Sequence, residues 1–177
     1  MLIPPLMHVF RLRHIPTLLR TSALSLLSDG INTSSVAFLP YTAGLSESMV
    51  DLLHLESVPE VTVARQIQPT KSQESETQSQ ATVDVLPTLL DAKLPILRRA
   101  AVHFLGSLFR TATMHTYETS TQDTAFSPAQ AKRARIILSY IASTDQDNVV
   151  RVMAREAIEG LDQLNAATRV ISVSYTL

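Results

Sequence analysis

The chain has 177 residues, a net charge of −1, four glycines, and neither cysteine nor tryptophan. The nearly neutral charge offers no electrostatic basis for binding nucleic acid or an anionic membrane surface. The scattered glycines exclude a glycine-rich phosphate loop, and the absence of cysteine excludes disulfides and thiolate metal sites. No apolar run reaches the roughly 18 residues of a membrane-spanning helix. Leucine and alanine dominate the apolar residues, which favours helices packed on helices.

The first third of the chain predicts three helices. A short helix covers residues 3–13. A second begins after Pro16, and Gly30 is a suitable C-cap for it. A third covers residues 35–56, and Pro40 is tolerable near its start.

Residues 57–82 differ in composition from the flanking segments. Their centre is rich in Ser, Gln, Glu and Thr and has no apolar residue to bury. We expect a disordered polar insertion here, placed between the two helices of one structural repeat. A short helix over residues 83–91 then leads to Pro95.

The helix that begins at Pro95 is expected to reach about Thr113, before a loop at 116–125. Its apolar residues have the i, i+4, i+7 spacing of one helix face, and they are Leu97, Ala101, Phe104, Leu105 and Leu108.

Two more helices are predicted at the C-terminal end. Ser127 and the proline after it form an N-cap signal for a helix over 128–143. After a capped turn at 145–148, the last helix covers 149–166. We expect residues 169–177 to be a flexible, β-prone tail.

One pattern occurs three times in the chain: an arginine, an alanine three residues later, and a leucine or isoleucine four residues after that. The copies begin at Arg20, Arg98 and Arg151. Repetition of one helix pattern is typical of stacked helical hairpins. The sequence therefore predicts an all-α, HEAT/armadillo-like α-solenoid of about three hairpins over residues 1–168.

The segments 19–27, 97–105 and 147–162 also carry a family resemblance. The Arg-x-Ser-x-Leu-Ser run that begins at Arg20 and the Arg-Arg-Ala-Ala-Val-His run that begins at Arg98 are its closest matches. The chain resembles the C-terminal domain of the fungal RNA polymerase II assembly and nuclear-import factor family. Its animal relatives are called transport and Golgi organisation protein six. The resemblance covers about residues 15–165. The chain differs from the family at residues 57–94 and at both ends, and family members are several times longer.

The resemblance implies a non-catalytic helical-repeat scaffold that binds RNA polymerase II subunits and nuclear-pore components, with no nucleic acid as partner. A Golgi or secretory trafficking scaffold is the alternative, and a fragment of another HEAT-repeat transport adaptor is a third. We expect a cytoplasmic protein that could shuttle to the nucleus. The family has no catalytic or cofactor-binding residues to transfer to this chain.

The repeat arginines have two interpretations. Each could bind an aspartate or a helix-end carbonyl and align the stack, with Asp147 as one candidate partner. Alternatively, they could line a groove and bind acidic segments of a partner protein. The candidate protein-interaction residues are Arg98, Arg99, Arg151 and Arg155, of which Arg99 and Arg155 are expected to be the exposed ones.

Three further cations, Lys132, Arg133 and Arg135, could extend a basic surface, although a solvated helix face is the favoured explanation. The five histidines show no metal-ligand spacing, and no Gly-x-Ser-x-Gly elbow is present. We therefore expect no catalytic residue, no metal site and no cofactor.

Overall fold

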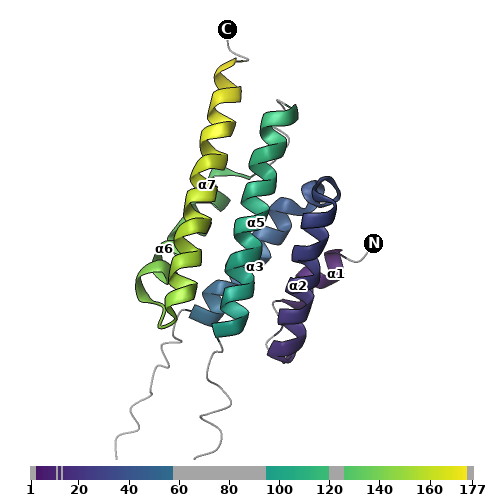
Figure 1. Cartoon of the computed structure of the whole chain (residues 1–177), viewed down its shortest axis with the longest axis vertical. Helices are drawn as coiled ribbons and strands as arrows, with labels where there is room; N and C mark the ends of the chain where they lie inside the picture. Colours follow the sequence, from purple (N-terminus) through teal and green to yellow (C-terminus); the bar gives the residue numbers. More distant parts are fainter. Residues whose placement is uncertain (1–2, 11, 13, 58–94, 120–125, 175–177) are drawn as a thin grey trace, which may run out of the picture.

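The computed structural model describes residues 3–10, 12, 14–57, 95–119 and 126–174. All the regular secondary structure in these ranges is helical (Figure 1). The prediction of an all-α protein is confirmed for them. The helices are α1 (Ile3–Val9), α2 (Thr17–Thr33), the 3-10 helix η1 (Ser35–Tyr41), α3 (Thr42–Ser57), α5 (Pro95–Thr119), α6 (Pro128–Thr144) and α7 (Asn148–Ser174).

The helices pack in two layers. One layer consists of α2, α5 and α7, which run side by side in the same direction with α5 in the middle (Figure 1). The other contains α3 and α6, which contact each other, and α1 packs against α3. The helices that carry the repeated arginine pattern therefore all lie in the first layer, and their first turns lie at the same end of it.

The predicted apolar faces form the core. All five residues of the predicted α5 face are at most 1% exposed. The principal apolar residues of α7 are also at most 1% exposed; they are Val150, Ala154, Ala157, Leu161 and Leu164. Those of α6 are at most 8% exposed; they are Ala131, Ala134, Ile137, Leu138 and Ile141. Burial of these faces is the main stabilising contribution of the fold.

Three expectations for the N-terminal third were wrong. The helix predicted over residues 3–13 ends at Val9. Gly30 does not cap α2, because it lies within the helix and packs against η1. A Cβ atom at Gly30 would lie 2.8 Å from Cζ of Phe38, so the missing side chain makes room for this ring. The single helix expected over residues 35–56 is divided into η1 and α3, with Pro40 inside η1. Proline lacks the N–H that a continuous α-helix would need there.

The C-terminal helices are longer than expected. The loop predicted at 116–125 begins later, because α5 continues to Thr119. The Thr113 and Thr116 hydroxyls donate hydrogen bonds to the carbonyls of Phe109 and Ala112, which accommodates threonine within a helix. Helix α7 continues to Ser174, so the tail predicted from residue 169 is wrong up to that point.

The N-cap prediction at Ser127 is confirmed. Its hydroxyl accepts a hydrogen bond from the Gln130 N–H, and the Gln130 side chain accepts one from the Ser127 N–H, which is a complete capping box. Apart from Ser57, which ends α3, the predicted insertion at 57–82 and the helix at 83–91 lie outside the described residues, as do residues 175–177.

Candidate interaction site: the turn between α6 and α7 and the groove between α5 and α7

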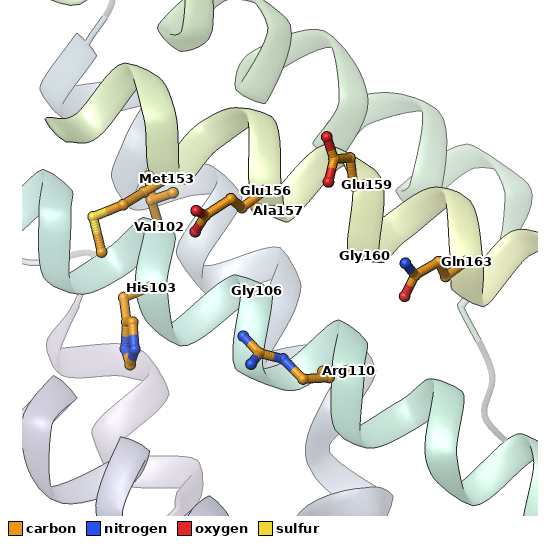
Figure 2. Close-up of a pocket in the computed structure, with 10 residues that line it drawn as sticks. All are labelled: Val102, His103, Gly106, Arg110, Met153, Glu156, Ala157, Glu159, Gly160 and Gln163. Carbon is orange, nitrogen blue, oxygen red and sulfur yellow. The ribbon is translucent and has the colours of Figure 1, made fainter. Parts of the chain in front are cut away.

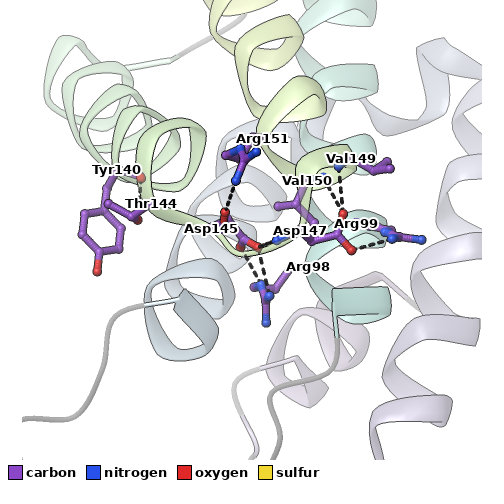
Figure 3. Close-up of polar contacts among 9 residues, drawn as sticks. All are labelled: Arg98, Arg99, Tyr140, Thr144, Asp145, Asp147, Val149, Val150 and Arg151. Atoms are coloured by element: carbon purple, nitrogen blue, oxygen red, sulfur yellow. Dashed lines mark hydrogen bonds and ion pairs between the residues drawn. The ribbon is translucent and has the colours of Figure 1, made fainter.

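Arg98 joins the start of α5 to the end of α6 through a buried ion pair. It lies in the first turn of α5 and is only 8% exposed. Its Nε donates a hydrogen bond to Oδ2 of Asp145 at 2.7 Å, and its Nη2 donates to Oδ1 at 3.0 Å (Figure 3). Asp145 is the C-cap of α6. This two-point, buried pair attaches the start of α5 to the end of α6.

A similar junction joins α2 and α3. Arg20, at the matching place in α2, binds Oε1 of Glu56 at 3.2 Å, and Glu56 lies near the end of α3. This pair is weaker in geometry, because Nε of Arg20 is buried without a hydrogen-bond partner. In both junctions an arginine in the first turn of one helix binds a carboxylate at the end of the next helix: α2 to α3, and α5 to α6.

Arg99 contacts the same turn as Arg98 but from the surface. Its Nη2 donates a hydrogen bond to Oδ2 of Asp147, while Oδ1 of Asp147 accepts from the N–H groups of Val149 and Val150 at 2.8 and 3.2 Å. Asp147 therefore caps the N-terminus of α7. The hydrogen bond from Arg99, followed by the two backbone N–H groups, holds the pKa of Asp147 below its ordinary value.

Arg99→Gln is expected to raise the pKa of Asp147 toward its ordinary value, because the principal cause of the lowering is removed. An NMR titration of the Asp147 carboxyl carbon measures this change. Because the pKa of Asp147 is lower in the folded protein, its ionised carboxylate stabilises the folded state. This contribution is complete above the pKa of an unfolded aspartate, about 3.9, and is lost as the pH falls through the folded pKa. Arg133→Gln is the control, since Arg133 contacts α3 instead. An unchanged Asp147 titration in Arg99→Gln would contradict this assignment.

Of the last two candidate arginines, Arg151 also contacts this turn, and Arg155 contacts the last turn of α6. Nη1 of Arg151 donates a hydrogen bond to the Asp145 carbonyl at 2.9 Å (Figure 3). Its Nη2 donates to the Asn148 side chain at 3.1 Å. Nη2 of Arg155 donates to the Ala142 carbonyl at 3.4 Å. Arg98, Arg99 and Arg151 thus contact the turn between α6 and α7, and Arg155 contacts the last turn of α6 before it. As predicted, Arg99 and Arg155 are the exposed members.

The possible basic surface on α6 is largely neutralised. Arg133 pairs with Asp51 of α3 at 2.5 Å, and Arg135 pairs with Asp162 of α7. Both pairs connect α6 with a neighbouring helix while the arginine side chains remain about half exposed. Arg98 and Arg99 are paired as well, so these cations stabilise the arrangement of helices more than they create a positive patch.

A groove between α5 and α7 was missed by the reasoning from sequence. This open groove has a volume of about 390 Å³, and Figure 2 shows its lining residues. Gly106 and Gly160 lie in its floor, where the two helices approach closely: a Cβ at Gly106 would lie 3.7 Å from Cβ of Ala157. Four of the ten lining residues come from α5 and six from α7, namely Val102, His103, Gly106, Arg110, Met153, Glu156, Ala157, Glu159, Gly160 and Gln163.

The two walls of the groove differ in charge. The α5 wall presents His103 and Arg110, and the α7 wall presents Glu156 and Glu159 (Figure 2). The ion pairs found among the described residues include none of these four side chains. Their hydrogen-bonding capacity is therefore available to a polypeptide that carries both acidic and basic groups.

The described residues offer little for other kinds of site. Within them, no group of three or more His, Asp or Glu side chains is placed to hold a metal ion. None of the described helices combines the length and hydropathy that crossing a bilayer requires.

Comparisons with protein-family models, with curated proteins and with solved structures each return no match for this chain. Assignment to a family therefore depends on the sequence resemblance alone.

Proposed function

We propose that this chain is a non-catalytic helical-repeat scaffold that binds other proteins. In this proposal it is a short HEAT-like solenoid whose hairpins are α1–α2, α3–α5 and α6–α7. The supporting observation is the recurring junction, in which Arg20 meets Glu56 and Arg98 meets Asp145. The same contact at successive steps is what a stack of equivalent units requires.

The groove between α5 and α7 is the proposed binding surface. It lies between two neighbouring helices of the layer that carries the repeat, and its charged walls are free of mutual ion pairs among the described residues. Protein partners are favoured over small molecules, because the groove is open and polar rather than an enclosed apolar pocket with a few polar groups.

The specific partners follow from the family resemblance. We infer a role in the assembly and nuclear import of RNA polymerase II, through polymerase subunits and nuclear-pore components, in a cytoplasmic protein that shuttles to the nucleus. The alternatives are a Golgi or secretory trafficking scaffold and a fragment of another HEAT-repeat transport adaptor.

Co-purification from cells tests these assignments. The full chain should recover polymerase subunits and nucleoporins, whereas recovery of coat components would favour the trafficking alternative. The double variant Arg110→Glu/Glu159→Lys, which reverses one charge on each groove wall, should lose the partner. The control is Lys132→Glu, on an exposed residue of α6. Recovery of neither class of partner would refute both assignments, and equal recovery by the groove variant would place the binding surface elsewhere.

A further inference from the structure

The side of α2 that faces away from α5 is open and carries exposed leucines. Leu18, Leu19 and Leu26 are 75%, 58% and 72% exposed. Leu19, Ser22 and Leu26 follow the i, i+3, i+7 spacing of a single helix face, and we call these three residues the α2 face.

This face occupies a position that is buried in both other helices of the layer. When the helices are aligned on their repeat arginines, Leu19 matches Leu97 and Val150, which are 1% and 0% exposed. By the same alignment Leu26 matches Phe104 and Ala157, which are 0% and 1% exposed. Cβ of Ala157 lies 3.7 Å from a Cβ built at Gly106, so this position faces the preceding helix of the layer. The α2 face is thus a helix-packing surface that no described helix covers.

The opposite end of the layer has different chemistry. Leu24 and Ile31 of α2 are both at most 2% exposed. By the same alignment they match Val102 and Phe109, the α5 residues that face the next helix of the layer, α7. The matching residues in α7 are Arg155 and Asp162, both exposed and polar. A second copy therefore cannot stack head to tail, because that contact would bury these charges against leucines. A contact in which both copies use the α2 face avoids burying these charges.

We propose that the α2 face pairs with the α2 face of a second copy, in an antiparallel arrangement about a two-fold axis. Leu19 and Leu26 are equidistant from the point between Ser22 and Ala23, so each Leu19 meets the partner's Leu26. Ser22 lies at the axis, where its small side chain permits close approach. Such an interface is self-complementary and closes after two subunits.

Charge supports this occupant. Asp29 is the one charged residue among the exposed residues of α2. In the antiparallel pair the two Asp29 carboxylates are about 20 Å apart along the axis, at 1.5 Å per residue. The charged residues exposed on the two α2 helices therefore do not meet across the interface. A contact formed by one helix face is small, so the expected dissociation constant is in the micromolar range.

Sedimentation equilibrium of the full chain, from low micromolar to several hundred micromolar, tests the proposal. The apparent mass should rise from 19.5 kDa toward twice that value. Leu19→Glu and Leu26→Glu should abolish the rise while leaving the helical circular dichroism unchanged, because both side chains are exposed. Val152→Glu, which replaces an exposed apolar residue of α7, should still dimerise.

Cross-linking tests the geometry. Because the chain has no cysteine, Ser22→Cys introduces a single thiol. A short bismaleimide should link two Ser22→Cys chains near the axis, and Ser139→Cys, on the exposed side of α6, should give no dimer above background. A monomeric wild type over the whole concentration range would overturn the proposal. So would a dimer that persists in both glutamate variants, since it would be formed by another surface.

Discussion

Ala154→Glu is expected to unfold the protein or to lower its melting temperature drastically. Ala154 is fully buried in α7, at a position matched by the equally buried Ala101 in α5. A glutamate there would have to bury an unpaired carboxylate and overfill a close helix contact. A loss of more than about 4 kcal/mol is expected from this class of substitution, against a typical total stability of about 5–15 kcal/mol. Circular dichroism with thermal melting measures it, and Ala101→Glu should behave in the same way.

Ala166→Glu is the matched control for this experiment. It places the same side chain in the same helix at an exposed position. Surface substitutions of this kind usually change stability by less than about 0.5 kcal/mol. A melting temperature for Ala154→Glu equal to that of Ala166→Glu would contradict both the burial of Ala154 and the repeat alignment.

Much of the fold was predictable because helical periodicity reports directly on burial. The i, i+4, i+7 spacing after Pro95 identified a face that is buried in the structure. The boundaries were less predictable, since they depend on tertiary contacts. A glycine after an apolar stripe indicates a C-cap, yet Gly30 packs against Phe38. Val and Ile near the C-terminus favour a strand in isolation, but Leu164 and Ala167 continue the buried face of α7.

The candidate site was predictable only in part, because sequence shows which side chains can form ion pairs but not which ones meet. Asp147 was the expected partner of a repeat arginine, and it binds Arg99, whereas Arg98 binds Asp145. The groove was missed because it forms where Gly106 of α5 faces Ala157 of α7 and Gly160 of α7 faces Phe109 of α5. These residues are distant in sequence, and only the packing of α5 on α7 brings them together. The available signal was a glycine within each of two otherwise regular helices.

Arg98→Met is the second substitution with a large expected effect. The Arg98 and Asp145 side chains are 10% and 3% exposed, so the substitution leaves a buried carboxylate without its cation. Removal of one partner of a buried pair costs about 3–5 kcal/mol. Chemical denaturation measures the loss. Arg133→Met removes the exposed pair with Asp51 and should cost about 1 kcal/mol or less. An equal loss in both variants would contradict a structural role for Arg98.

The double variant Arg98→Met/Asp145→Leu separates the two contributions to that loss. If the cost arises from an uncompensated buried carboxylate, replacing Asp145 as well should restore part of the stability. Full recovery is not expected, because Oδ1 of Asp145 also accepts a hydrogen bond from the Asp147 N–H at 2.9 Å. Arg20→Met should cost less than Arg98→Met, since the Arg20–Glu56 contact is longer and Nε of Arg20 is unpaired. We expect the loss of stability to decrease in the order Arg98→Met, Arg20→Met, Arg133→Met, which follows the burial and hydrogen bonding of the three ion pairs. This order would identify the junction between α5 and α6 as the principal polar contact that aligns the helices.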